Sequence, residues 1–189
     1  MKRLTMILTA FLLSMVLVIP VQAHPSRLVD EADVFTDAEE AELVAMLDEL
    51  STECTFDIVA VTVDSLYGES AEDYADDYFD YNGYGMGEHY DGALLLISME
   101  DRQWHISTCG YGITAISDND LYQIEEEILP YLSSGEYVEA IENFAWLSAG
   151  YVQEALGYTM FFGFVMVCCL VTVAVTFLLK VDPEYGKKK

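Results

Sequence analysis

The sequence predicts an α/β protein in which helices layer on a small mixed sheet, followed by one C-terminal transmembrane helix. Helical and strand patterns follow one another in the order α-β-α-β-β-α-α, and a helix joins the first two strands. Such a crossover connection makes these two strands parallel. An uncharged stretch near the C-terminus is long enough to span a membrane.

The first 23 residues have the pattern of a secretory signal peptide. Lys2 and Arg3 precede an apolar run over Leu4–Ile19, and Pro20 breaks this run shortly before the small residue Ala23. A basic start, an apolar core and a small residue at the cleavage site define such a peptide. We therefore expect cleavage after Ala23. The alternative, an uncleaved anchor, leaves the following domain on the same side of the membrane.

Helix and strand signals alternate through the first half of the domain. Thr36 and Glu39 form a capping box, and leucines recur behind it at helical spacing as far as about Thr52. The stretch Phe56–Val63 is apolar and β-branched, which predicts a buried strand. A second helix is expected over Ser70–Asn82, where it stops at the glycines.

A hairpin and two helices are predicted next. Gly92–Ser98 is continuously apolar, as in a strand covered on both faces. Arg102–Thr108 alternates, with His105 on its exposed face. The third helix is capped by Ser117 and Asp120 and is expected to kink or end at Pro130, and the fourth covers Tyr137–Leu156.

The stretch Tyr158–Leu179 contains no charged residue over 22 positions. At about 1.5 Å per residue it can cross a hydrocarbon core of roughly 30 Å. Lys180 and Lys187–Lys189 follow it, and such positive flanks stay in the cytoplasm. The sequence therefore predicts a single-pass type I protein of the cell membrane. Its extracytoplasmic domain covers residues 24–157 and its cytoplasmic tail residues 180–189.

The extracytoplasmic domain is strongly acidic. Residues 24–157 contain two basic residues, Arg27 and Arg102, against 31 acidic ones, a formal charge of −29. A field of this sign repels nucleic acids and free anions and favours cations or basic partner surfaces. Nucleic-acid binding is therefore excluded.

Two cysteines, Cys54 and Cys109, are expected at the same end of the sheet in an oxidising compartment. A disulfide follows if their strands are neighbours. The apolar strand Gly92–Ser98 is expected to lie between them, which separates the outer strands by about 9.6 Å. A disulfide needs a Cα separation of about 4.4–6.8 Å, so the bond stays an open alternative.

The glycine-rich stretch Asn82–Gly92 raises the question of a ligand loop. A phosphate cradle leads into a helix N-terminus, whereas these glycines follow a helix and lead into a strand. A regular EF-hand is also excluded, because its first and twelfth positions would be Tyr78 and His89. An irregular cation site remains possible in the sequence.

Carboxylates gather on both sides of this loop. Asp73, Asp76, Asp77 and Asp80 share one face of the predicted second helix. Oxygen ligands suit a hard cation such as Ca²⁺. The predicted metal ligands are Asp76, Asp77, Asp80, Glu88 and Asp91; the alternative is a solvated acidic face. The sequence has no G-x-S-x-G, H-E-x-x-H, C-x-x-C or P-loop motif.

Four blocks of the sequence resemble the TPM domain family. They are LVDEADVFTDAEEAEL at Leu28–Leu43, FDIVAVTVDSL at Phe56–Leu66, YADDYFDYNGYGMG at Tyr74–Gly87 and DGALLLISMEDRQWHISTCGYGI at Asp91–Ile113. The resemblance implies a three-layer α/β/α sandwich outside the cytoplasm, often followed by a membrane helix. The resemblance assigns the family's acidic positions to these residues of the matching blocks: Asp30, Asp33, Asp76, Asp77, Asp80 and Asp91.

The resemblance implies two different kinds of activity. A plant thylakoid-lumen relative is described as an acid phosphatase with a cation-binding acidic pocket, and an animal relative modulates a membrane receptor. Because no catalytic motif is found, we expect an accessory or interaction module for a membrane or envelope protein, with Ca²⁺ or another divalent cation as a possible ligand. The alternative is a metal-dependent acid phosphatase.

Overall fold

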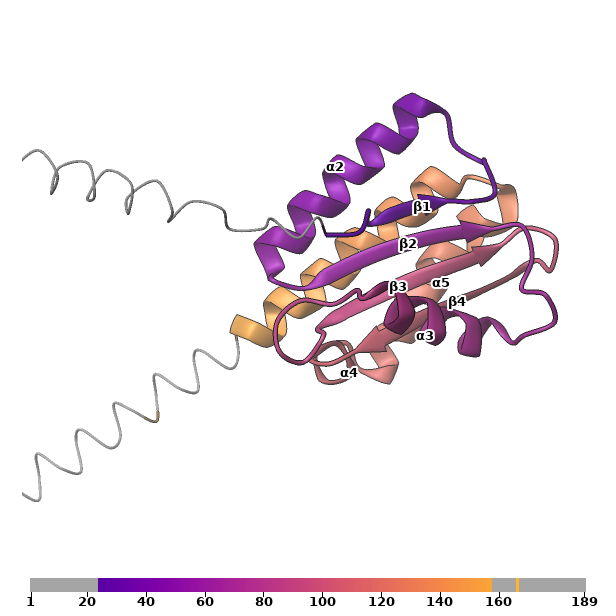
Figure 1. The fold of residues 1–189 in the computed structure, drawn as a ribbon. Coiled ribbons are helices and arrows are strands. Elements are labelled where there is room, and N and C mark those ends of the chain that lie inside the picture. The colour runs from indigo at the N-terminus through magenta and orange to yellow at the C-terminus, as the bar shows by residue number, and fades with distance from the viewer. Residues whose placement is uncertain (1–23, 158–165, 167–189) are drawn as a thin grey trace, which may run out of the picture.

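The computed structural model describes residues 24–157 and residue 166 (Figure 1). The predicted signal peptide and cytoplasmic tail, and all but one residue of the predicted transmembrane segment, lie outside the described residues. Within residues 24–157 and at 166, no helix is both long and apolar enough to span a membrane.

A four-stranded mixed sheet forms the centre of the domain. Its strands lie in the order β1 (Leu28–Asp30), β2 (Asp57–Val63), β3 (Gly92–Ser98) and β4 (Gln103–Cys109). Strands β1, β2 and β3 are parallel, and β4 pairs with β3 as an antiparallel hairpin. The predicted parallel pair, the hairpin and the central place of β3 are confirmed. Strand β1 was not predicted, because three residues are too short for an alternation to appear.

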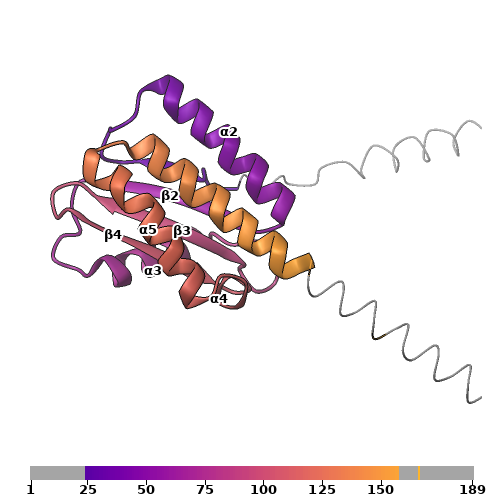
Figure 2. The same cartoon turned by 180° about the vertical axis from the view of Figure 1, so that it is seen from behind.

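Three long helices cover one face of the sheet (Figure 2). They are α2 (Asp37–Cys54), α5 (Asp118–Ser134) and the C-terminal helix over residues 137–157. The predicted capping box at the start of α2 and the predicted cap at the start of α5 are both present, and the second is also a capping box. Of the two outcomes expected at Pro130, an end of the helix is wrong. Helix α5 continues past this proline for another turn, and the αL residue Gly135 caps its end.

Helix α3 (Ala71–Asn82) covers the other face, so the domain is an α/β/α sandwich (Figure 1). Strands β2 and β3 are buried at every position because helices cover both of their faces. The sequence predicted that the second hairpin strand has one exposed face. This prediction is wrong, because α3 packs over β4. His105 is half-buried and Ser107 is buried beneath this helix. A short helix, α4 (Gly112–Ala115), follows β4 and was not predicted.

Candidate functional site

A buried ion network lies at the amino end of β2. The carboxylate of Asp57 is fully buried, and its Oδ1 accepts a hydrogen bond from Nε of Arg27 over 2.7 Å. Its Oδ2 accepts from the backbone N–H of Gly85 over 2.8 Å and lies 3.1 Å from Nε2 of His24. The Arg27 guanidinium also pairs with Asp48 on α2. This network therefore joins the N-terminal segment, α2, β2 and the glycine-rich loop.

The glycine-rich loop, residues 82–92, is a compact turn held by this network. Met86 and Asp91 exchange two backbone hydrogen bonds of 3.0 and 2.8 Å, which close a four-residue turn between them. Tyr84 is buried and donates its hydroxyl proton to the Ser26 carbonyl over 2.8 Å. Burial, with the nearby negative charge of Asp57, raises the pKa of Tyr84 to about 12.

Three of the predicted cation ligands lie close to the Cys109 thiol. Burial chiefly, and then the charges of Asp80, Asp91 and Asp76, raise the pKa of this thiol. Two of these carboxylates are already hydrogen bonded: Asp76 accepts from the hydroxyl of Ser107, and Asp91 accepts from a backbone N–H.

The other two predicted ligands, Asp77 and Glu88, are exposed. Among residues 24–157 and at 166, no group of three or more histidine, cysteine or acidic side chains is arranged to hold a metal ion. The divalent cation stays a prediction.

Of the other acids in the matching blocks, Asp30 has a clear structural use. Its two carboxylate oxygens accept from the backbone N–H groups of Val34 and Phe35 over 3.2 and 3.0 Å. The hydroxyl of Thr62 also donates to this carboxylate. Asp30 therefore fixes the turn that leads into α2. Asp33 lies within this turn with a positive φ of 51°.

The disulfide alternative is not realised in the structure, where Cys54 and Cys109 are both free. Strand β3 lies between β2 and β4, as the sequence indicated. The two thiols also belong to opposite faces of the sheet: Cys54 packs in the core under α2, and Cys109 packs in the core under α3. The sulfur of Cys54 contacts the carbonyl of Ala149 at 3.8 Å.

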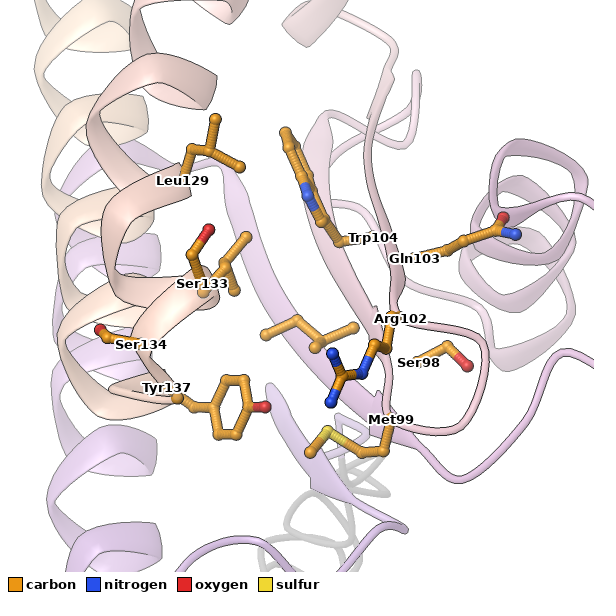
Figure 3. Close-up of a pocket in the computed structure, with 12 residues that line it drawn as sticks. Ser98, Met99, Arg102, Gln103, Trp104, Leu129, Ser133, Ser134 and Tyr137 are labelled. Carbon is orange, nitrogen blue, oxygen red and sulfur yellow. The ribbon is translucent and has the colours of Figure 1, made fainter.

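Two surface grooves lie at opposite ends of the sheet. One, of about 860 Å³, lies beside the amino ends of β2 and β3 and is lined by Cys54, His89, Asp91 and Leu156, among others. The other, of about 590 Å³, lies between the β3–β4 turn and the junction of α5 with the C-terminal helix (Figure 3). We call it the Arg102 groove, after the arginine that reaches into it.

Comparison with known proteins identifies the family. The family model of the TPM domain matches residues 28–147, so the chain belongs to the TPM domain family. A curated relative, the UPF0603 protein YdjH of Bacillus subtilis (strain 168), is 26% identical over 157 residues. The match covers 79% of this chain but only 60% of the relative, so this chain aligns with little more than half of that protein.

Solved structures share the fold. The N-terminal domain of a protein from P. gingivalis has a TM-score of 0.61 at 20% identity, covering 71% of this chain and 86% of that one. The N-terminal domain of the cg2496 protein from Corynebacterium glutamicum has a TM-score of 0.55 at 17% identity, covering 68% and 81%. The BA42 protein from Bizionia argentinensis has a TM-score of 0.53 at 20% identity, covering 62% and 83%.

Proposed function

We propose that this TPM-domain protein is an accessory module, anchored in the membrane, that binds a basic surface of another membrane or envelope protein. The observation that carries the proposal is the outer surface around α3. Tyr81 at its end is 84% exposed and Tyr67 just before it is 85% exposed. The carboxylates of Asp77 and Asp80 are exposed on the same helix.

Exposed tyrosines among carboxylates suit a protein partner. Tyrosine combines a large apolar ring with a polar tip and is enriched at protein interfaces. The surrounding carboxylates attract basic side chains over long range. Arg27 cannot offset this charge at the surface, because it is buried against Asp57 and Asp48.

The test is affinity capture from solubilised membranes with the full chain as bait at low and high salt. We expect a partner that is retained at low salt and lost at high salt. The variant Asp77→Asn/Asp80→Asn should reduce capture several-fold. A matched control, Glu139→Gln/Glu142→Gln, removes two exposed charges from the C-terminal helix on the other face and should leave capture unchanged. Equal loss in both variants contradicts the proposal.

A metal-dependent acid phosphatase is the second candidate, supported by the negative charges of Asp76, Asp80 and Asp91, all of which act on the Cys109 thiol and raise its pKa. A divalent ion bound there would reverse the local charge and admit a phosphoester into an acidic domain. Phosphatase assays with Ca²⁺, Mg²⁺ and Mn²⁺ test this candidate, and the absence of turnover with every metal removes it.

Thermal melting tests the cation separately from catalysis. A native-state site predicts that added Ca²⁺ raises the melting midpoint above a matched ionic-strength control. The variant Asp80→Asn should remove that rise. If added Ca²⁺ does not raise the melting midpoint of the wild type, these carboxylates form a solvated acidic surface and not a cation site.

A further inference from the structure

We propose that the Arg102 groove binds the C-terminal carboxylate of a partner chain whose last side chain is apolar. This inference rests on the proposed function and extends it by naming a second contact site, separate from the outer surface around α3, and the chemistry of the bound end. Four observations support it, and they concern the freedom of the guanidinium, its backbone, the groove walls and the surrounding charge.

The Arg102 guanidinium is free in a domain crowded with acids. Within residues 24–157 and at 166, every ion pair involves Arg27 or His24, so Arg102 has none in this part of the chain. Its neighbour Asp101 is engaged elsewhere: one carboxylate oxygen accepts from the backbone N–H of Leu66 over 2.7 Å and from the Ser98 hydroxyl over 2.9 Å. These bonds lower the pKa of Asp101 and hold its charge on the turn.

The backbone places the arginine where a different residue fits better. Arg102 has a φ of 52°, in the left-handed region, at the end of the turn between the paired residues Ser98 and Gln103. Glycine and asparagine adopt this region more readily than arginine. Strain of this kind concentrates at functional positions. The backbone of the turn therefore does not explain why position 102 is an arginine. We infer that the guanidinium group explains it.

The groove walls complement a carboxylate attached to an apolar group. Figure 3 shows the Arg102 guanidinium reaching toward Met99 and the hydroxyl end of Tyr137, while Trp104 and Leu129 lie farther along the groove. A guanidinium binds a carboxylate through two parallel hydrogen bonds, and a phenol can donate a third. A volume of about 590 Å³ is typical of sites for small ligands or short peptide ends.

The charge of the domain favours a protein end over a free anion. A domain with two basic and 31 acidic residues repels small carboxylates from solution. A partner chain can compensate with basic residues ahead of its C-terminus. Exposed Glu100 and Glu136 are next in sequence to the groove-lining residues Met99 and Tyr137, and they are the acids that we expect to receive them. The expected occupant therefore ends in an apolar residue with a free carboxylate and carries lysine or arginine just before it.

The experiment measures fluorescence anisotropy with the full chain in detergent micelles. The probe is an N-terminally labelled decapeptide that ends in two lysines, an alanine and a leucine with a free carboxylate. We expect this peptide to bind at least tenfold more tightly than the same peptide with an amidated C-terminus. Equal binding of the two forms overturns the proposal.

Variants at the turn separate binding from folding. Arg102→Asn removes the guanidinium and suits a positive φ, so we expect at least a tenfold loss of affinity with no fall in the melting midpoint. Arg102→Lys keeps the charge without the two-pronged geometry and should lose several-fold. Unchanged affinity in Arg102→Asn overturns the proposal.

Competition with N-acetyl-leucine identifies the source of the carboxylate. Displacement of the peptide only at far higher concentration supports a protein end, and displacement at similar concentration contradicts it. The α3 variants Asp77→Asn/Asp80→Asn distinguish the two proposals, because they lie away from the Arg102 groove. Peptide binding that persists in these variants, together with failed capture of a membrane partner by the wild type, would refute the accessory role alone.

Discussion

The carboxylate of Asp57 and the guanidinium of Arg27 meet inside the domain, with Oδ1 accepting a hydrogen bond from Nε over 2.7 Å. Both side chains are buried, and they bring together segments 30 residues apart in the sequence. The same carboxylate binds the backbone of the glycine-rich loop. A single acidic residue at the start of β2 thus holds the N-terminal segment and the loop in place.

Removing this carboxylate should destabilise the domain strongly. Asp57→Asn removes the buried carboxylate and leaves Arg27 with Asp48 alone, whose side chain is 54% exposed; breaking a buried pair costs about 3–5 kcal/mol. Asp48→Asn is the matched control. Asp48 pairs with the same guanidinium, but its own side chain is 54% exposed. We expect it to cost at most about 1 kcal/mol. Urea unfolding followed by circular dichroism measures both, and equal losses would show that the buried pair is not the main contributor.

The buried hydroxyl of Tyr84 should make stability depend on alkaline pH. Burial and the charge of Asp57 raise its pKa from the ordinary value of 10.0 to about 12, so the folded chain keeps this proton after the unfolded chain has lost it. The contribution of the protonated Tyr84 hydroxyl to the free energy of unfolding is complete below pH 10 and is lost as the pH rises toward 12.

Comparison with Tyr84→Phe isolates this contribution. The variant also loses the hydrogen bond to Ser26, worth about 0.5–1.5 kcal/mol below pH 10. The difference in unfolding free energy between wild type and variant should therefore shrink between pH 10 and 12, as measured by urea titrations. A difference that stays constant over this range contradicts the assignment.

Two glycines of the loop should respond differently to alanine. At Gly85 φ is 99° and an added Cβ would lie 2.5 Å from the backbone carbon of Tyr90, so the loop must move. At Gly83 φ is 71°, but nothing lies within 4 Å of an added Cβ. We expect Gly83→Ala to cost about 1 kcal/mol, the conformational penalty alone, and Gly85→Ala to cost clearly more. Equal melting midpoints for the two variants contradict the close approach.

Cys54 and Cys109 should both react as free thiols. Burial raises the pKa of each thiol, so alkylation of the folded chain at pH 8 should be slow at both. Cys109 should react first because it is half-exposed while Cys54 is buried. Unfolding without a reductant should make both fully reactive, as peptide mass analysis can show. A linked pair of peptides under these conditions contradicts the free state.

The elements predicted correctly from the sequence are those with local signals. The capping boxes at Thr36 and Ser117 involve residues three positions apart, so the sequence displays them directly. Strand β1 has no comparable signal, since it forms only by pairing with β2, some 30 residues later. The covered face of β4 was missed because alternation describes one strand and does not reveal a helix that packs over it.

The candidate sites were predicted less completely for the same reason. The acids of α3 could be placed on one helix, yet the hydrogen bond of Asp76 to Ser107 depends on a strand 31 residues away. The Asp57 network was also missed. Its signals were present: an aspartate at the head of an apolar strand, and Arg27 as one of only two cations in the domain. Pairing them required the fold.

The C-terminal helix runs from the Arg102 groove, which Tyr137 lines, to the opposite end of the sheet, where Leu156 lies beside Cys54. With about 1.5 Å of rise per residue, its 21 described residues span roughly 30 Å. If Tyr158–Leu179 enters the bilayer as the sequence predicts, the end of the helix at Leu156 is joined to the membrane by fewer residues than the end at Tyr137. The Arg102 groove then belongs to the end of the domain that is farther along the chain from the anchor, a position that suits contact with proteins outside the membrane.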